Sequence, residues 1–138
     1  MKLTKIAPND TGVVALVEWD AEGVVTKGEM PRGLGARQKG GGIYIRRRDS
    51  RVELHVMNAV ALNTAPTIPI PSEYSATADT WETIQASTYS PRKMIYADAG
   101  AGHLTIRGGL LEGDVLGSYQ YRTVFRWETN TFFPTPDR

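Results

Sequence analysis

Residues 42–56 read GIYIRRRDSRVELHV, and this stretch decides the fold. Apolar residues alternate with polar ones on both sides of a charged break, which is the pattern of a β-hairpin with one buried face. If Arg46 pairs with Arg51 across the four residues between them, the apolar sets of both strands point to the same side. A slip of one residue would turn one set to water, so the pattern determines which face is buried. The opposite, polar face then carries Tyr44, Arg46, Arg51, Glu53 and His55.

The same alternation recurs on either side of this hairpin. Residues 13–19, 93–97 and 103–107 read as strands, and residues 118–127 read as a long closing strand. We expect the large side chains on one face of that last strand to anchor the core, namely Tyr119, Tyr121, Phe125 and Trp127. The sequence therefore predicts an all-β domain of about seven or eight strands, a compact antiparallel β-barrel or a jelly-roll-like sandwich.

Other segments lack this alternation. Residues 1–9 read as an N-terminal arm ahead of a single domain at residues 10–138. Residues 28–42 are rich in glycine, and we expect an exposed, mobile loop because such glycine density does not sustain a helix. Residues 72–88 read as a long excursion with room for one helical turn around residues 80–84.

Composition narrows the classes of partner. The chain has no cysteine, which excludes disulfides and thiolate metal sites. Sixteen basic and fifteen acidic residues leave a net charge of +1. A dedicated nucleic-acid-binding protein is expected to have a large excess of basic residues. No window approaches the roughly 20 apolar residues of a membrane span, and the first residues lack a secretion signal. We expect no nucleic-acid partner, no membrane insertion, and synthesis in the cytoplasm without a signal peptide.

Catalytic and metal-binding motifs are sparse. Gly33-Leu34-Gly35 lacks the strand-to-helix setting of a dinucleotide site, and no phosphate-binding loop motif is present. His55 and His103 fall on outward strand positions without further ligands nearby in sequence, so we expect neither a metal nor a cofactor. The basic run at residues 46–48 has Asp49 beside it and no interleaved aromatic residues, which favours a solvated turn or a subunit contact over phosphate binding.

Aromatic and acidic residues gather in and after the long excursion. Flat aromatic rings pack against the pyranose face while carboxylates accept hydrogen bonds from sugar hydroxyls, so this mixture suits binding a saccharide. The candidate saccharide-binding residues are Tyr74, Asp79, Trp81, Glu82 and Tyr89. Two alternatives stay open: Asp79 and Glu82 as a hydrolytic carboxylate pair, and Trp81 as a side chain that simply pins the excursion to the core.

Several short motifs follow one another between residues 10 and 127. They are Asp10-Thr11-Gly12, Ile43-Tyr44-Ile45-Arg46-Arg47, Val52-Glu53-Leu54-His55-Val56, Tyr89-Ser90-Pro91-Arg92, Ile95-Tyr96-Ala97, Leu104-Thr105-Ile106-Arg107 and Gly117-Ser118-Tyr119. Their order resembles that in the C-terminal head domains of tail, baseplate and receptor-binding proteins from phages of Gram-positive bacteria. The resemblance implies a virion protein of the tail tip or baseplate that forms a homotrimer and attaches to host cell-wall polysaccharide without catalysis.

Three hypotheses of function follow from the residues and the resemblance together. The first is the adhesion head, with host polysaccharide, its own copies and other tail or baseplate proteins as partners. Its polar hairpin face mixes charges of both signs, which suits an oligomer interface. The second is a structural virion protein, a decoration or tail-assembly module without glycan binding. The third is a wall-degrading enzyme, for which the carboxylates above are the only sequence support.

Overall fold

The computed structural model describes residues 9–76, 84–131 and 133, and within them the strands form three antiparallel sheets. Sheet A contains, in spatial order, β12 (Thr123–Glu128), β5 (Arg51–Met57), β4 (Gly41–Arg48), β1 (Val14–Trp19) and β2 (Val25–Lys27). Sheet B contains β7 (Thr67–Pro69), β10 (His103–Gly108), β9 (Met94–Gly100) and β8 (Ile84–Ser87). Sheet C contains β11 (Val115–Leu116), β6 (Ala59–Ala61) and β3 (Leu34–Ala36).

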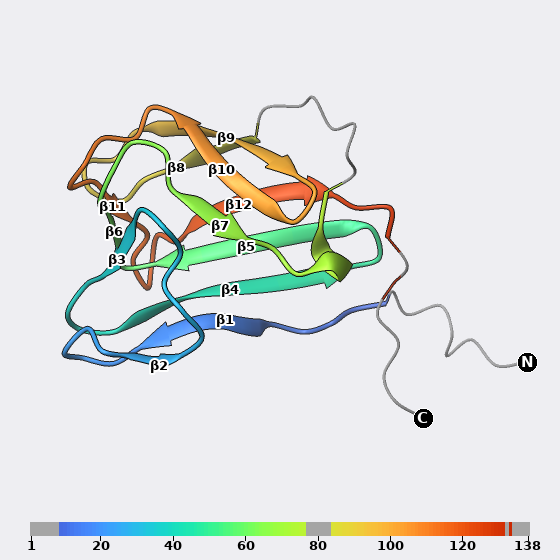
Figure 1. Cartoon of the computed structure of the whole chain (residues 1–138), viewed down its shortest axis with the longest axis horizontal. Coiled ribbons are helices and arrows are strands. Elements are labelled where there is room, and N and C mark those ends of the chain that lie inside the picture. The colour runs from blue at the N-terminus through green and yellow to red at the C-terminus, as the bar shows by residue number, and fades with distance from the viewer. Residues whose placement is uncertain (1–8, 77–83, 132, 134–138) are drawn as a thin grey trace, which may run out of the picture.

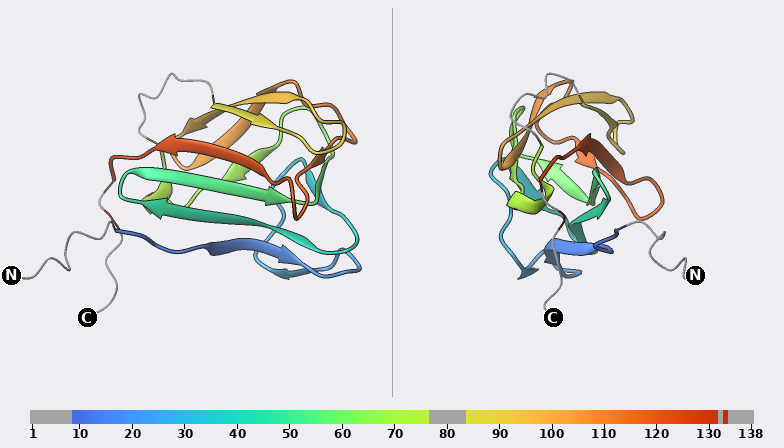
Figure 2. Two further views of the ribbon diagram at one scale, coloured as in Figure 1. Left: turned by 180° about the vertical axis from the view of Figure 1, so that it is seen from behind. Right: turned by 90° about the vertical axis from the view of Figure 1, so that its right-hand side faces the viewer.

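Sheets A and B are the two layers of a sandwich (Figure 1), and the end-on view shows both curving around the core (Figure 2). Sheet C lies at one end of the sandwich, which we call the cap end. The β4–β5 turn and a short 3-10 turn, η2 (Ser72–Tyr74), lie at the opposite end, which we call the turn end. The expected all-β fold is confirmed. No helix among the described residues has the length and apolar character needed to cross a membrane.

The core forms between the inner faces of sheets A and B because burial alternates along their strands with a period of two. Sheet A supplies large residues, among them Ile43, Ile45, Leu54, Val56 and Phe125, all fully buried. Opposite them, β9 supplies the small residues Ala97 and Ala99 while β10 supplies Leu104 and Ile106. Each large aliphatic side chain buried in this way contributes about 1.5–3 kcal/mol relative to leaving it exposed.

The register of the central hairpin differs from the one expected. Arg48 pairs with Arg51 and Arg46 with Glu53, so the turn consists of Asp49 and Ser50 alone. Asp49 adopts a φ of 50°, the left-handed conformation that two-residue hairpin loops require and that Asp tolerates. The observed pairing is offset from the expected one by two residues, and two is the side-chain period. Every apolar residue therefore stays on the buried face.

Arg47 lies inside the sandwich at the turn end, although the sequence placed it in a solvated basic run. Its position in β4 turns it to the inner face, where it is 4% exposed. The guanidinium donates to the backbone carbonyls of Asp49, Glu73 and Thr131 at 2.5 to 2.7 Å, and it also lies 5.1 Å from the centre of the Phe133 ring. A buried cation is tolerated when its donors are satisfied in this way. Arg47 thus ties the hairpin to η2 and to the C-terminal segment.

The glycine-rich segment at residues 28–42 differs in part from the expected exposed loop, because it contains β3 and the start of β4 between exposed turns. Leu34 in β3 is only 2% exposed, and Gly41 and Gly42 are buried residues of β4. A Cβ atom on Gly41 would lie 2.3 Å from the Met57 carbonyl oxygen and 2.7 Å from the Trp19 ring. Glycine is required here because a tryptophan ring packs directly on the backbone of β4.

The end of the chain also differs from the expected long strand. β12 begins at Thr123, and Phe125 and Trp127 are buried as predicted. The assignment of Tyr119 and Tyr121 to the core is wrong, because their side chains are 68% and 53% exposed. A turn ends the alternation here: the Ser118 N–H donates to the Tyr121 carbonyl at 3.0 Å.

In the excursion at residues 72–88, η2 and the unexpected strand β8 occupy the described parts. The expected helical turn at residues 80–84 falls largely outside the described residues, and its last residue, Ile84, opens β8. The N-terminal arm likewise lies outside them except for Asn9.

Gly117 provides a direct test of how the β11–β12 loop is placed. Its φ is +77°, and a Cβ atom would lie 1.8 Å from the Val56 carbonyl oxygen. We expect Gly117→Ala to lower the free energy of unfolding by roughly 3 kcal/mol or more, from backbone strain and steric overlap combined. Gly102 is the matched control, since its φ is +82° with no atom within 4 Å of the added methyl group. Gly102→Ala should cost about 1 kcal/mol. Urea denaturation measures both, and equal losses would contradict the close approach to Val56.

Candidate functional site

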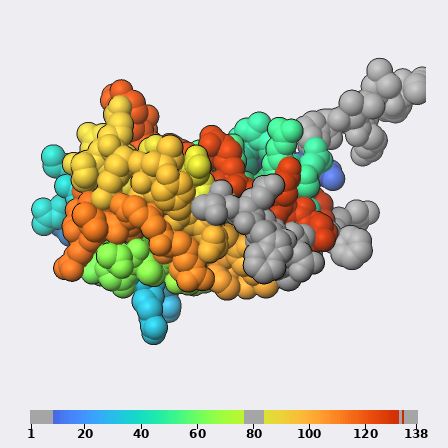
Figure 3. Space-filling view, turned by 90° about the horizontal axis from the view of Figure 1, so that it is seen from above, coloured from blue at the N-terminus to red at the C-terminus, as the bar shows by residue number. Residues whose placement is uncertain are grey.

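Three exposed side chains form a compact group at the cap end. The rings of Tyr89 and Tyr121 stack with their centres 6.3 Å apart and their planes 18° from parallel. The guanidinium carbon of Arg92 lies 4.1 Å from the centre of the Tyr121 ring. We call these residues the tyrosine–arginine cluster. Figure 3 shows the two segments that carry it side by side, the residue 88–93 connection in yellow and the residue 117–122 loop in orange-red.

The residue 88–93 connection is held by hydrogen bonds on both sides. Tyr89 N–H donates to the Val115 carbonyl at 2.9 Å, and Val115 N–H donates back to the Ser90 carbonyl at 2.9 Å. The buried Thr88 hydroxyl donates to the Pro91 carbonyl at 2.5 Å. These bonds fix the backbone of Tyr89 against β11, so the backbone that carries its ring has few alternative conformations.

An ion pair fastens the same connection to the loop before β11. Lys93 Nζ lies 2.6 Å from Asp114 Oδ2, and the Leu111 N–H donates to the same carboxylate oxygen at 2.8 Å. Burial by itself raises the pKa of Asp114, but the hydrogen bonds from Lys93 and Leu111 outweigh it and lower that pKa overall. Asp114 therefore stays ionised and holds Lys93 beside the cluster.

The residue 117–122 loop presents Tyr121 from the other side. The Tyr121 N–H donates to the Ser118 hydroxyl at 3.0 Å, which closes a turn that starts at the buried Gly117. At the far end of the loop, the Thr123 hydroxyl donates to the Ser87 carbonyl at 2.8 Å. Both ends of the loop are thus anchored to the sandwich while its tyrosines face solvent.

The structure places two of the candidate saccharide-binding residues, Tyr74 and Tyr89, at opposite ends of the sandwich. Tyr74 is in η2 at the turn end, 6% exposed, and its carbonyl accepts a 2.7 Å hydrogen bond from Trp127 Nε1. Tyr89 is 38% exposed at the cap end, where its partners are Tyr121 and Arg92. The other three candidates lie outside the described residues, namely Asp79, Trp81 and Glu82. Of the two predicted residues that the structure describes, Tyr89 belongs to the cluster and Tyr74 does not.

Sequence reasoning did not select Arg92 or Tyr121 as site residues. Tyr121 was assigned to a buried strand face because the alternation of the last strand was extended through a turn. The signal that could have revealed the turn is Gly117-Ser118, since glycine followed by serine is typical of a chain reversal. Arg92 stands beside Pro91 in the Tyr-Ser-Pro-Arg motif, but its contact with Tyr121 depends on two segments far apart in sequence.

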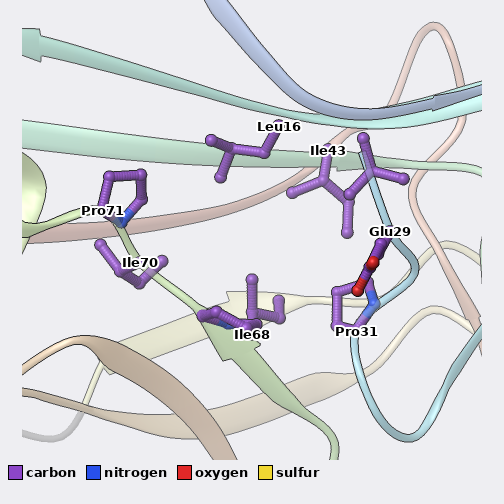
Figure 4. Close-up of a pocket in the computed structure, with 9 residues that line it drawn as sticks. Leu16, Glu29, Pro31, Ile43, Ile68, Ile70 and Pro71 are labelled. Carbon is purple, nitrogen blue, oxygen red and sulfur yellow. The ribbon is translucent and has the colours of Figure 1, made fainter. Parts of the chain in front are cut away.

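A pocket lies between the two sheets, away from the cluster. Figure 4 shows this apolar pocket, which has a volume of about 410 Å³, between β1 and β4 on one side and residues 68–71 on the other. Its lining includes Leu16, Ile43, Ile68, Ile70, Pro31 and Pro71, together with the Glu29 side chain. A saccharide requires many hydrogen-bonding partners, and an apolar lining does not supply them. The apolar pocket is therefore a poorer match to a sugar than the tyrosine–arginine cluster.

The proposed oligomer face carries the predicted residues on the outside of sheet A, where most of them are bound within the chain. Glu53 accepts hydrogen bonds from Arg126 at 3.1 Å and contacts His55 at 3.3 Å. Burial raises the pKa of Glu53, and these two hydrogen bonds lower it by more. The Tyr44 hydroxyl donates to Glu18 at 3.1 Å, and burial followed by this bond raises the pKa of Tyr44. Arg51 is exposed beside the turn. These contacts leave few charges on this face for a partner.

Arg46 completes this face through an ion pair with Asp10. Its Nε and Nη2 atoms donate to the two Asp10 carboxylate oxygens at 3.0 and 2.5 Å. Arg48 Nε lies 3.9 Å from the same group, and the Gly12 N–H donates to it at 2.8 Å. The hydrogen bond from Arg46, followed by that from Gly12, lowers the pKa of Asp10 to about 2. Two residues of the basic run are thus paired near the turn, and Asp10 holds the start of the described chain against β4.

Within residues 9–76, 84–131 and 133, no group of three or more His, Asp or Glu side chains gathers in the geometry of a metal site. His103 is exposed on β10, and His55 lies on sheet A. Comparison with protein-family models, curated proteins and solved structures gives no match. The chemistry of the surface must therefore carry the functional argument.

The Asp10 contacts predict a change in acid stability. Because the folded pKa of Asp10 is below its unfolded value, its contacts stabilise the fold above about pH 4, and this stabilisation is lost as the pH falls toward 2. We expect Asp10→Asn to be less stable than the parent at neutral pH and to show a shallower loss of stability between pH 4 and 2. Urea denaturation across this range measures the effect. Asp98→Asn, which removes an exposed partner of Arg107, is the matched control for the loss of one surface carboxylate. An unchanged slope in Asp10→Asn would contradict the assignment.

Proposed function

We propose that this chain is the non-catalytic head domain of a phage tail-tip or baseplate adhesin that binds host cell-wall saccharide. The observation that carries the proposal is the tyrosine–arginine cluster, a stacked and solvent-exposed aromatic pair with a guanidinium against it. The order of motifs along the sequence supports the same class of protein. The cluster contains two motif residues, Tyr89 and Arg92, on one connection.

The cluster has the groups that saccharide recognition uses. The nearly parallel rings have their centres 6.3 Å apart, and both tyrosines are exposed, so a pyranose can reach them. The tyrosine hydroxyls both donate and accept hydrogen bonds, and Arg92 supplies further donors. A sugar presents the same combination of apolar C–H faces and hydroxyl groups.

The scaffold reduces the cost of binding. Backbone hydrogen bonds to Val115 and the anchored 117–122 loop hold both rings before any ligand arrives. Ordering a rotamer-rich side chain on binding costs about 0.5–1.5 kcal/mol, and tyrosine brings a large contact area with only two side-chain torsions. A small preorganised contact of this kind suits weak, repeated binding along a polysaccharide.

We further propose that the adhesin acts as a homotrimer, because three copies convert weak individual contacts into useful avidity. The molecular mass in solution, measured by light scattering on the intact chain, is expected to be three times that of one chain. A monomer at all accessible concentrations would contradict the trimer. The contact between saccharide and the cluster of a single chain could still be tested in that case.

The saccharide contact itself is tested by Tyr121→Ala. This substitution removes the ring that touches both Tyr89 and Arg92, and we expect about a tenfold loss of affinity for wall polysaccharide. Affinity is measured against a panel of polysaccharides purified from the walls of Gram-positive bacteria. Since Tyr121 is exposed, the thermal unfolding midpoint of the Tyr121→Ala variant should stay near that of the parent.

The matched control is Tyr96→Ala, which removes a tyrosine that is 39% exposed on the outer face of β9, outside the cluster. This variant should keep the parental affinity. Equal affinity of Tyr121→Ala and the parent would show that the cluster is not the contact. If the parent protein binds no wall preparation and Tyr121→Ala disturbs particle assembly, the structural virion function replaces the adhesin.

A further inference from the structure

A polar groove of about 410 Å³ runs along the outside of the sandwich beside the cluster. It follows the seam where β8 of sheet B lies against β12 of sheet A, strands that are held together by the bond from Thr123 to the Ser87 carbonyl. Because side chains alternate along each strand, the outward residues of both strands form its walls. The lining includes Gln85 and Ser87 of β8, Val124 and Arg126 of β12, Met94 at the start of β9 and Arg122 just before β12.

The groove continues from the tyrosine–arginine cluster. Arg122 directly follows Tyr121 in the chain, Ser87 stands two residues before Tyr89, and Met94 stands two residues after Arg92. A strand advances about 3.3 Å per residue, so these wall residues begin within one sugar length of the cluster. Figure 2 shows β12 in red with β8 in yellow alongside it in the view from behind.

Arg122 gives the groove a positive charge, and Arg126 adds a second guanidinium whose charge is paired with Glu53. Arg122 is exposed, and within the described residues no carboxylate lies in ion-pair distance of it. Arg126 donates one hydrogen bond to Glu53, which leaves the rest of its donors available. The lining residues include no Asp or Glu. The charge is local, since the whole chain carries only +1.

We propose that the polar groove is an anion-binding subsite, so that the saccharide bound by this chain carries carboxylate or phosphate groups. The inference rests on the proposed function and adds the class of ligand to it. The planar guanidinium fork matches carboxylate and phosphate oxygens in two parallel hydrogen bonds, a geometry that neutral hydroxyls do not reproduce. The cluster then receives a sugar ring while Arg122 and Arg126 receive the charged groups of the neighbouring units.

The test uses the intact chain and glycans in matched pairs. One pair is an oligogalacturonate and its methyl ester, and the other is a phosphorylated mannan oligosaccharide and the same glycan after phosphatase treatment. At low ionic strength we expect the charged member of at least one pair to bind about tenfold more tightly than its neutral partner. The pair that shows the difference identifies the anion as carboxylate or phosphate.

Arg122→Gln should reduce the affinity for the charged glycan about tenfold and leave the neutral glycan within about twofold. Arg32→Gln is the matched control, because it removes the same unit of charge from an exposed arginine outside the groove. If both variants weaken binding equally, the effect is one of net charge and the subsite is overturned. Thermal unfolding confirms that each variant is folded.

The failure of this inference is distinguishable from failure of the proposed function. Equal binding of charged and neutral glycans would overturn the anion subsite and leave the adhesin proposal standing. If no glycan binds, the adhesin proposal fails. Anion binding in the groove is then tested separately with inorganic phosphate. In that experiment the NMR signals of the Arg122 and Arg126 side chains should shift with sodium phosphate but not with sodium chloride of equal ionic strength. Unchanged signals would overturn the subsite.

Discussion

The pairing of β4 with β5 is the constraint on which the rest of the structure depends. Its two-residue turn at Asp49 and Ser50 puts Ile45 opposite Leu54 and Ile43 opposite Val56, all on the face that meets sheet B. The neighbouring strands β1 and β12 add to the two outer edges of this pair and continue the same apolar face. A register change of one residue would expose the whole set and remove most of the hydrophobic stabilisation of the core.

Two glycines let other parts of the chain pack closely against this hairpin. Trp19 packs on Gly41 of β4, and Gly117 sits against the Val56 carbonyl of β5. The second contact also has a functional consequence, because the loop that starts at Gly117 delivers Tyr121 to the surface. The same strands that bury the core thus determine where the exposed tyrosines stand. At the other end, Arg47 satisfies the backbone carbonyls that the hairpin, η2 and the C-terminal segment leave inside.

The proposed ligand site combines a rigid aromatic contact with a charged groove. The cluster comes from two connections held by backbone hydrogen bonds, and the groove comes from the seam between two sheets that contact each other without a shared ladder at that point. Among the described residues Arg122 has no carboxylate within ion-pair distance, and Arg126 uses one of its donors on Glu53. Beside the hairpin turn the charges are instead paired within the chain, as in Arg46 with Asp10. The polar groove therefore has arginine donors available to a partner, whereas the arginine beside the hairpin turn is already paired with Asp10.

The sequence by itself determined the all-β class, the buried faces of the central hairpin and the outward position of Tyr44, Glu53 and His55, because alternation with a period of two is a local property. It also identified Tyr89 as a candidate contact. It offset the pairing of the two hairpin strands by two residues, a shift that alternation cannot detect, and it carried the last strand through the turn at Gly117. Tertiary structure alone decided which carbonyls satisfy the buried Arg47, that Leu34, Gly41 and Gly42 pack inside, and that Tyr89, Arg92 and Tyr121 meet. Each of these depends on segments distant in the chain, whose contacts follow from packing between sheets and leave no periodic signal in the residues themselves.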